Sequence, residues 1–395
     1  MLNILLITAG FPFGESERSF LNTEYNILKQ NANLHILAIT KSTETTQLEN
    51  VNKFHDYRPS ILEALGQLRY KIVRENIWEA RKTSFICWLR RIKDIIAYSA
   101  HSDHIQKTLE KLINFNQISI VYTYWCVPAT VAALRIKEGN KNIKVITRFH
   151  GFDLCLEQTK NNWHPLRNYI SSNIDRMYFA CKRSRDYYIK LYSYEEKCEV
   201  AYLGTKKRKY LGVPDRKDKI VLLSCSSVIP IKRVELIAET VYELSKKIKV
   251  EWYHIGGPTK RFKILDESGI KYNLLGQVPN KKIDWIYANV NPDLFITLSS
   301  TEGGTPVSIQ EAFSMGIPAL GTDVGGIPDS IIENETGYVV SMNAEPLMVS
   351  DKIVKHMQLH YKDKMKMSHN AYTLWKDQFN AEKNAESFLE KIINI

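Results

Sequence analysis

The sequence predicts an α/β protein built from two doubly wound domains, and three observations support this prediction. The chain has 395 residues, which is too many for one ordinary hydrophobic core. In both halves, short apolar runs of strand length alternate with longer segments of helical periodicity. Each half also opens with a strand, a loop and a helix in succession, which is the repeating unit of a parallel sheet with right-handed crossovers.

The apolar periodicity places the elements along the chain. In the first half it predicts, in order, Ile4–Thr8, the helix Ser19–Gln30, Leu34–Ile39, Ile118–Tyr122, the helix Val127–Lys137 and Lys144–Thr147. In the second half it predicts Lys219–Cys225, the helix Ile231–Ile248, Glu251–Ile255, Leu294–Leu298 and the helix Pro306–Met315. Glycine, proline and charged residues replace this periodicity at Leu203–Asp218, the expected junction. We therefore expect domains at 1–203 and 204–375, with a C-terminal helix at about 376–395 packing back on the first.

The formal net charge of +11 is compatible with three kinds of partner: nucleic acid, an anionic membrane surface or a phosphorylated small molecule. The basic run Lys206–Lys209 is short and no nucleic-acid-binding motif accompanies it. We therefore interpret it as a solvated linker and expect no nucleic-acid partner. The cysteines are scattered without Cys-x-x-Cys spacing, so neither a metal site nor a disulfide framework is expected.

Two further segments bear on localisation. The opening Met1–Gly10 has no basic leader and is typical of a buried strand, and no segment approaches the roughly 18 apolar residues of a membrane span, so we expect a cytoplasmic protein. Ser60–Tyr98 mixes apolar and basic residues, which at helical spacing would form an amphipathic helix. Such a helix either contacts the inner membrane surface, making the protein peripheral on the cytoplasmic membrane, or turns a basic face to solvent, and the sequence leaves both open.

The stretch Ser299–Pro318 is typical of a ligand site at the start of a helix. Thr305 is a good N-cap, Pro306 suits the first helical position, and Gly304 keeps side chains away from the helix start. Backbone N–H groups and the helix dipole then favour a phosphate at this end. Glu311 lies about a turn and a half further on, where its carboxylate can accept hydrogen bonds from the ribose of a nucleotide.

Charged and polar side chains also follow other predicted strands. Lys232 and Arg233 follow the first strand of the second domain, where they can meet a second anionic group. His150 follows a strand of the first domain and precedes a glycine. Because ligands of open parallel sheets bind outside the carboxyl ends of the strands, we expect these residues to face one crevice.

With these residues, the chain resembles the family 4 glycosyltransferases, retaining enzymes of GT-B fold that use nucleotide sugars. The resemblance extends over nearly the whole chain, through Gly10-Phe-Pro-Phe-Gly-Glu-Ser-Glu17, Tyr122-Thr-Tyr-Trp125, Arg148-Phe-His-Gly-Phe-Asp153, Lys232-Arg233, His254-Ile-Gly-Gly257, the Glu302–Ala312 block, Gly316-Ile-Pro318 and Thr322-Asp-Val-Gly-Gly326. It implies two Rossmann-like domains facing a central cleft, and a reaction that needs no metal or other cofactor. In agreement, the chain has no Asp-x-Asp motif.

The resemblance also implies roles for individual residues. Glu311 would hold the donor ribose, Lys232 the diphosphate, and His150 would lie against the donor sugar near the reacting carbon. The remaining donor-side residues are Gly14 in the N-terminal glycine loop, Gly256, and Gly304, Thr305, Pro306 and Val307 at the start of the helix. The acceptor side of the cleft would be lined by Glu17, Trp125, Arg148 and Asp153.

Two positions depart from the family's pattern. Gly303 stands where the family has an acid, and we assign Glu302, one residue earlier, to the sugar hydroxyls through a bulged glycine loop. Ser227 stands where the family commonly has an arginine on the diphosphate. Arg233 or another cation would replace that arginine.

We therefore expect a retaining hexosyltransferase that moves a hexose from a nucleotide sugar, taken as UDP-linked, to a saccharide acceptor, taken as lipid-linked. The expected setting is bacterial surface polysaccharide biosynthesis, that is, capsule, O-antigen or exopolysaccharide. Two alternatives stay open. One is a non-catalytic GT-B binding subunit of a glycosyltransferase complex. The other is an enzyme like the UDP-N-acetylglucosamine 2-epimerases, which also have two such domains.

Overall fold

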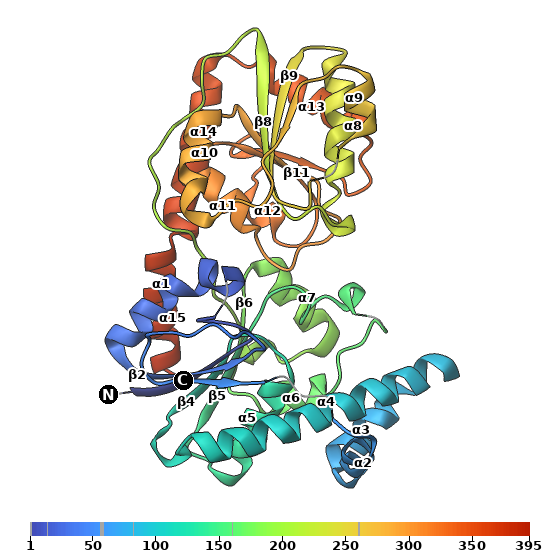
Figure 1. The fold of residues 1–395 in the computed structure, drawn as a ribbon, viewed down its shortest axis with the longest axis vertical. Helices are drawn as coiled ribbons and strands as arrows, with labels where there is room; N and C mark the ends of the chain where they lie inside the picture. Colours follow the sequence, from blue (N-terminus) through green and yellow to red (C-terminus); the bar gives the residue numbers. More distant parts are fainter. Residues whose placement is uncertain (1, 14, 56–58, 82, 160, 260) are drawn as a thin grey trace. The chain divides into compact units, whose positions relative to one another are not determined.

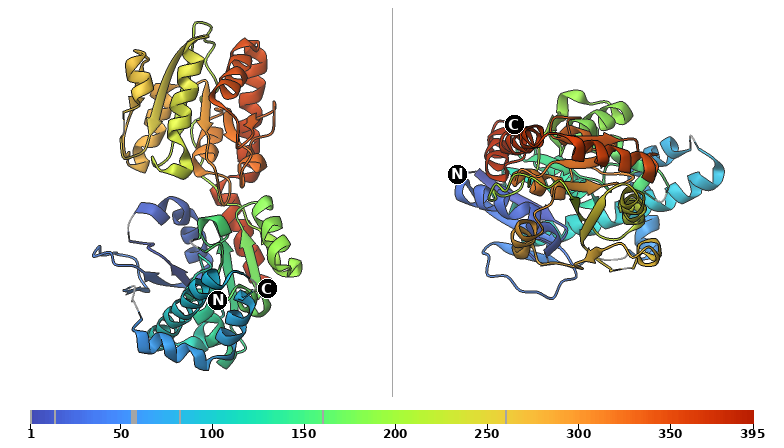
Figure 2. Two further views of the ribbon diagram at one scale, coloured as in Figure 1. Left: turned by 90° about the vertical axis from the view of Figure 1, so that its right-hand side faces the viewer. Right: turned by 90° about the horizontal axis from the view of Figure 1, so that it is seen from above.

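The computed structural model describes residues 2–13, 15–55, 59–81, 83–159, 161–259 and 261–395. The chain divides into two compact units (Figure 1): Met1–Ala201 with Ala385–Ile395, and Tyr202–Asn384. Each unit has one parallel sheet with helices on both of its faces (Figure 2). The α/β class with two doubly wound sheets is thereby confirmed.

The first unit contains a seven-stranded sheet in the order β3-β2-β1-β4-β5-β6-β7. Its strands are β1 (Leu2–Thr8), β2 (Ala32–Ile39), β3 (Val51–Phe54), β4 (Ile120–Thr123), β5 (Lys144–Phe149), β6 (Arg176–Phe179) and β7 (Cys198–Val200). Its helices are α1 (Glu15–Asn31), α2 (Ile61–Gly66), α3 (Lys71–Ala80), α4 (Phe85–Leu112), α5 (Pro128–Gly139), α6 (Arg167–Asn173), α7 (Lys182–Tyr192) and most of α15 (Ala381–Ile393).

The second unit contains a six-stranded sheet in the order β10-β9-β8-β11-β12-β13. Its strands are β8 (Lys219–Cys225), β9 (Lys249–Ile255), β10 (Tyr272–Leu274), β11 (Leu294–Thr297), β12 (Ala319–Thr322) and β13 (Gly337–Val340). Its helices are α8 (Val234–Ser245), α9 (Lys263–Glu267), α10 (Ile283–Val290), α11 (Val307–Ser314), α12 (Ile327–Ser330), α13 (Pro346–Gln358) and α14 (Tyr361–Gln378), together with the short 3₁₀ turn η5 (Pro230–Lys232).

Strand β1 shows why the sheets are covered on both faces. Ile4 and Leu6 pack in a core shared with α1 and α15, whereas Leu5 and Ile7 pack in a core shared with α4 and α5. Successive side chains of a strand point to opposite faces, so a strand that is apolar throughout must be buried on both. On the α15 side, the ring of Phe388 lies 5.2 Å from that of Tyr122.

The strand order places the predicted site residues. In each sheet the order reverses once, between β1 and β4 in the first unit and between β8 and β11 in the second. Connections leave such a switch point in opposite directions and open a crevice outside the carboxyl ends of the two strands. The glycine loop follows β1 and Trp125 follows β4, while Lys232 follows β8 and Glu302 follows β11.

The segment Ser60–Tyr98 differs from the single helix that its periodicity predicts. It forms α2, α3 and the first half of α4, because capping groups restart the helix. Ser60 caps α2 in a reciprocal arrangement with Glu63, and Ser84 accepts a hydrogen bond from Cys87 N at the start of α4.

Candidate functional site

In the second unit, the loop after β11 is packed tightly against a glycine turn. A Cβ atom on Gly325 would lie 1.7 Å from the carbonyl oxygen of Glu302, and one on Gly326 would lie 2.4 Å from the carbonyl carbon of Gly304. Gly325 also has a φ of +48°, which favours glycine. The two glycines thus let the backbone that carries Glu302 approach the turn after β12.

Helix α11 starts one residue later than the sequence predicts. Val307 is its first residue and Pro306 occupies the N-cap position, so the prediction of Thr305 as N-cap is wrong. The Thr305 hydroxyl instead donates a 3.0 Å hydrogen bond to Gly326 O. The hydroxyl is drawn away from the helix start because the glycine turn packs against it.

Lys232 and Glu302, which the sequence assigns to diphosphate and sugar, form a direct ion pair. The Lys232 ammonium comes from η5 after β8, and the Glu302 carboxylate comes from the loop after β11. Their side chains are 23% and 12% exposed. The two strand ends at the switch point therefore bring together two groups 70 residues apart in the sequence.

Arg233 binds backbone carbonyls. Its backbone is left-handed, with a φ of +46°, at the N-cap of α8. Nε donates to Leu298 O at 2.6 Å, Nη2 to Ser299 O at 3.2 Å and Nη1 to Met342 O at 2.7 Å. Arg233 thus stabilises the residues that follow β11. Its contact with a phosphate stays a prediction.

Glu311 lies in a buried charge cluster. Its Oε1 accepts a 2.7 Å hydrogen bond from Nη2 of Arg208, whose Nε donates at 2.7 Å to Asp284. Glu311 and Arg208 are 6% and 7% exposed. Burial raises the pKa of Glu311, and the charge of Arg208 opposes that rise. The interpretation of Lys206–Lys209 as a solvated linker is wrong for Arg208, because Glu311 and Asp284 draw this cation inside.

Two buried polar atoms in this cluster have no hydrogen-bond partner among the residues that the structure describes: Arg208 Nη1 and the Tyr287 hydroxyl. Burial and the neighbouring Cys225 and Glu311 raise the pKa of Tyr287, which is therefore a protonated donor at neutral pH. A buried polar group without a partner costs about 1–3 kcal/mol. A polar ligand beside Glu311 would satisfy both groups. Tyr287 was not predicted as a site residue from the sequence. Arg208 was not predicted either, and the sequence indicated it only through the basic run Lys206–Lys209.

Gly256 has a steric role at the end of β9. A Cβ atom there would lie 1.8 Å from Ser226 O, and its φ is +135°. Only glycine lets this strand end pass so close to the loop after β8. Its contact with a nucleotide sugar stays a prediction.

In the first unit, the glycine loop wraps around the carboxylate of Glu17. The backbone N–H groups of Ala9, Gly10 and Phe11 donate to it at 3.2, 2.5 and 2.6 Å. The indole N–H of Trp125 donates to the same carboxylate. Glu17 as a whole residue is 4% exposed. Glu17 thereby fixes the loop after β1 to the residue that follows β4. Gly14, also predicted as a site residue, lies outside the described residues.

His150 lies beside Trp125, with ring centroids 4.3 Å apart. Its Nε2 is 3.0 Å from the carbonyl oxygen of Tyr124, which can only accept, so Nε2 carries the hydrogen. Burial and then the charge of Arg148 lower the pKa of His150 to about 3, so the imidazole is neutral at pH 7. Asp153 holds this turn by accepting hydrogen bonds from the backbone N–H groups of His150 and Cys126 at 2.9 and 3.0 Å.

Arg148 does not line a cleft, and the prediction that it does is wrong. It is 1% exposed and forms an ion pair with Glu24 at 2.6 Å. Its guanidinium lies 4.1 Å from the ring centroid of Phe388 in α15. Arg148 follows its neighbours on β5 into the core because Glu24 compensates its charge there.

Two features are absent from the described part of the chain. No group of three or more His, Cys, Asp or Glu side chains is arranged to hold a metal ion. No helix among the described residues has the length and apolar character needed to cross a bilayer.

Comparison with known proteins places this geometry in a family. Residues 207–374 match the family described as "Glycosyl transferases group 1". N-acetyl-alpha-D-glucosaminyl L-malate synthase of Bacillus anthracis is 20% identical over 307 residues, 73% of this chain and 78% of that protein. The putative teichuronic acid biosynthesis glycosyltransferase TuaC of Bacillus subtilis (strain 168) is 28% identical over 182 residues, 46% of this chain and 43% of that protein.

Among solved structures, Anabaena Alr3699/HepE in complex with UDP and glucose is similar with a TM-score of 0.70 at 14% identity, covering 100% of both chains. At this identity the likeness shows the fold, which is GT-B. The family match covers the part of the second unit that carries Lys232, Glu302 and Glu311. Residues 207–374 of the second unit are thus similar to the group 1 glycosyltransferases, and the chain as a whole has the GT-B fold.

Proposed function

We propose that this chain transfers a hexose from a UDP-sugar, with retention of configuration, to a lipid-linked saccharide in the assembly of a bacterial surface polysaccharide. The observation that carries the proposal is the buried cluster around Glu311. It combines, at the carboxyl end of the second sheet, a carboxylate with a guanidinium nitrogen and a phenol that have no hydrogen-bond partner among the described residues. A solved structure of similar fold contains UDP, which supports the choice of nucleotide. A relative named for teichuronic acid biosynthesis supports the proposed setting.

Ribose would complete the cluster. A carboxylate has two acceptor oxygens, and the hydrogen bond from Arg208 uses only Oε1 of Glu311. A ribose hydroxyl can donate to Oε2 and accept from Arg208 Nη1 or the Tyr287 hydroxyl. The pairing with Arg208 also keeps Glu311 ionised against its burial.

The diphosphate would be stabilised at Lys232 and the start of α11. As the glycosidic bond breaks, negative charge grows on the leaving UDP, and a fixed ammonium with helix-terminal N–H groups stabilises this charge. In the structure Lys232 is paired with Glu302. We propose that bound donor separates the pair, so that Lys232 turns to phosphate and Glu302 accepts from the sugar hydroxyls.

Retention follows when the acceptor hydroxyl attacks from the face that the diphosphate leaves. The departing phosphate oxygen can take the proton of that hydroxyl, so no protein base is required. A neutral imidazole at His150 fits this scheme, because its pKa of about 3 leaves it uncharged beside the sugar. Its Nδ1, which has no hydrogen when Nε2 carries it, can accept from a sugar hydroxyl.

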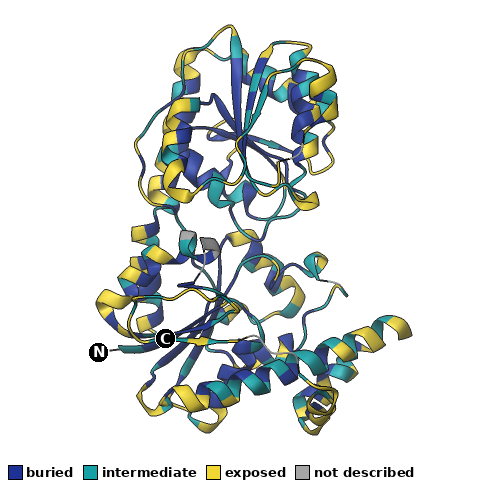
Figure 3. Ribbon diagram, viewed as in Figure 1, coloured by how far each residue is buried: buried dark blue, intermediate teal, exposed yellow. Residues whose placement is uncertain are grey.

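The proposed lipid-linked acceptor is supported by exposed apolar and basic side chains on α2, α3 and the first part of α4, where Figure 3 colours many residues as exposed. Eight large hydrophobic side chains at 61–89 are exposed: Ile61, Leu62, Leu65, Leu68, Trp78, Phe85, Ile86 and Leu89. Exposed arginines lie among them at Arg69, Arg74, Arg81 and Arg90. We name these twelve residues the α2–α4 surface. Exposed apolar and cationic groups in one segment suit an anionic bilayer, and we propose that the protein is peripheral on the cytoplasmic membrane.

A donor screen tests the enzymatic proposal. Purified full-length protein is incubated with UDP-, GDP- and dTDP-hexoses without acceptor, and slow release of nucleoside diphosphate is measured. We expect UDP-hexoses to raise the melting temperature and to be hydrolysed slowly. If no UDP-hexose binds but another nucleotide sugar does, the UDP assignment is wrong. If no nucleotide sugar binds, the enzymatic proposal is wrong.

A further inference from the structure

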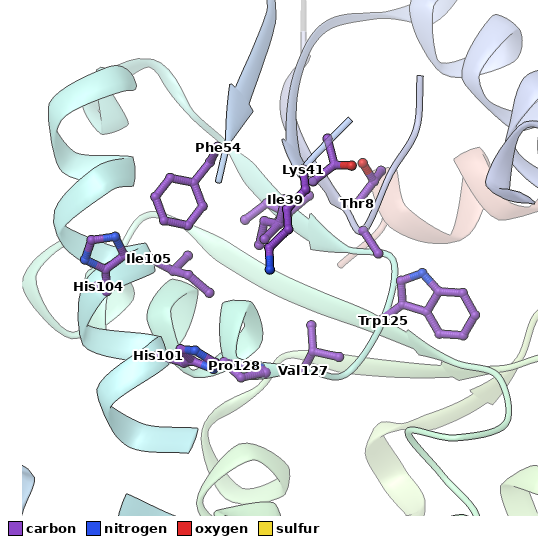
Figure 4. Close-up of a pocket in the computed structure, with 13 residues that line it drawn as sticks. Thr8, Ile39, Lys41, Phe54, His101, His104, Ile105, Trp125, Val127 and Pro128 are labelled. Atoms are coloured by element: carbon purple, nitrogen blue, oxygen red, sulfur yellow. The ribbon is translucent and has the colours of Figure 1, made fainter. Parts of the chain in front are cut away.

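The first unit contains a cavity of about 580 Å³ at the carboxyl ends of β1, β2 and β3 (Figure 4). One wall comes from Trp125 and the start of α5, and the other comes from α4. This volume is that of a typical site for a small molecule. Of the residues that line it, the sequence analysis singled out Trp125 alone.

The cavity is lined by apolar side chains and by three basic side chains. Ile39, Phe54 and Ile105 contribute apolar walls, while His101 and His104 come from one face of α4, three residues apart. Figure 4 shows the Lys41 side chain directed among these residues. No carboxylate of the described residues lines the cavity, and Lys41 forms no ion pair with any of them. Lys41 is exposed, and its ammonium beside these apolar walls can form a charge-assisted hydrogen bond with a bound anion.

The cavity adjoins the residues assigned to the reaction. Trp125, which lines it, donates to Glu17 and lies against His150. Ala9, the first residue of the glycine loop, also lines it. A molecule bound here would therefore lie next to the imidazole that is proposed to meet the donor sugar. Aromatic walls at Trp125 and Phe54 suit the apolar face of a pyranose ring.

Helix α4 connects this cavity to the α2–α4 surface. Leu89 belongs to that surface, and His101 lines the cavity 12 residues further along the same helix. At 1.5 Å per residue this is about 18 Å along the helix axis. An acceptor anchored in a membrane at one end of α4 could thus reach the cavity with its head group.

We propose that this cavity is the acceptor site and that it recognises a sugar carrying an anionic group, with Lys41 binding the anion and His101 and His104 lining the site beside it. The inference rests on the proposed function and names its acceptor class. The anion is either a phosphate that joins sugar to lipid or a carboxylate on the sugar itself. Both present oxygens to the same ammonium.

The test uses full-length protein saturated with UDP, so that the donor site is filled. Three probes are titrated by calorimetry: a short-chain prenyl phosphate, glucuronate and neutral methyl glucoside. We expect at least one anionic probe to bind, and Lys41→Met to weaken it tenfold or more while Lys41→Arg restores most of the affinity. Binding of the prenyl phosphate alone identifies a lipid phosphate, and binding of glucuronate alone identifies a sugar carboxylate.

The matched control is Lys144→Met, at the amino end of β5 and outside the cavity. It should leave probe binding unchanged. Lys41→Met should also keep UDP affinity and acceptor-free donor hydrolysis within about twofold, since neither process uses the cavity. The proposal is overturned if no anionic probe binds, if Lys41→Met binds as wild type does, or if methyl glucoside binds equally well. If the wild type does not bind UDP at all, the result would instead count against the proposed function.

Discussion

Arg208 donates a hydrogen bond of 2.7 Å to Glu311 across 103 residues of sequence, and both side chains are buried. The contact joins a basic run at the start of the second unit to the helix after β11. It neutralises the carboxylate proposed to bind ribose and leaves Arg208 Nη1 without a partner among the described residues. Arg208 is therefore placed to orient Glu311 and to contact the nucleotide.

Replacing Arg208 with Met should weaken UDP binding by roughly tenfold to a hundredfold, because a charge-assisted hydrogen bond is worth about 1.5–3 kcal/mol. Calorimetry would measure this for UDP and 2′-deoxy-UDP. The wild type should bind UDP more tightly than 2′-deoxy-UDP. Both Arg208→Met and Glu311→Gln should reduce this difference in affinity, whereas a residue with only a structural role would leave it unchanged. The control is Arg261→Met, an exposed arginine of the same unit. Unchanged discrimination in both variants would refute the ribose assignment.

Replacing Lys232 with Ala should lower kcat by about a hundredfold or more, because loss of one preorganised charge at a leaving group costs about 2.7–4 kcal/mol. Glu302→Gln should raise the KM for the donor without weakening UDP binding, since UDP lacks the sugar and the variant no longer pairs with Lys232. Donor hydrolysis and UDP titrations separate the two effects. Full activity of Lys232→Ala would remove Lys232 from the diphosphate site.

The α2–α4 surface should bind anionic vesicles. Arg81 and Arg90 are exposed, and each arginine near such a surface contributes about 1 kcal/mol, so changing both to Gln should weaken sedimentation with phosphatidylglycerol vesicles about thirtyfold. Arg91 is left in place because it donates to Asn161 O and Asn162 O, and Lys82 lies outside the described residues.

The apolar part of the same surface is tested by Trp78→Ser, with Trp285→Ser as its control. These tryptophans are 64% and 66% exposed, in the first and second unit respectively. Only Trp78→Ser should reduce vesicle binding. Equal behaviour of both variants, or unchanged binding by the double arginine variant, would show that the surface is only solvated.

Stability of the second unit should fall as the pH drops from about 6.5 to 4. Burial lowers the pKa of His254 to about 4 and that of His356 to about 3, below the unfolded value of about 6.5. The unfolded chain therefore takes up these protons first, at about 1.4 kcal/mol per pH unit for each histidine. The stabilisation is complete above about pH 6.5. Urea midpoints between pH 7.5 and 4.5 would measure the slope.

His356→Gln should reduce the slope of the free energy of unfolding against pH by the contribution of one proton, about 1.4 kcal/mol per pH unit. His369→Gln, at an exposed position in α14, serves as the control and should keep the slope of wild type. An unchanged slope in His356→Gln would mean that His356 is protonated in the folded state.

The strands that the sequence analysis located are those with continuous apolar runs. Lys219–Cys225 is found with the same bounds, and Leu34–Ile39 lies within β2. Short strands such as β6, β7 and β13 were missed, because three or four residues carry too little periodicity to separate a strand from a loop. Their pairing with longer neighbours in the sheet stabilises them.

The sequence by itself determined where strand, loop and helix succeed one another, and hence that Lys232, Glu302 and His150 follow strands. That information is local, since period and turn residues act over a few neighbours. Only the tertiary structure decided the partners: Glu17 with Trp125, Lys232 with Glu302, and Arg208 with Glu311. A parallel sheet brings distant segments to one edge, and the cost of burying a charge then selects which opposite charge each group meets, as Arg148 shows by pairing with Glu24 inside the core.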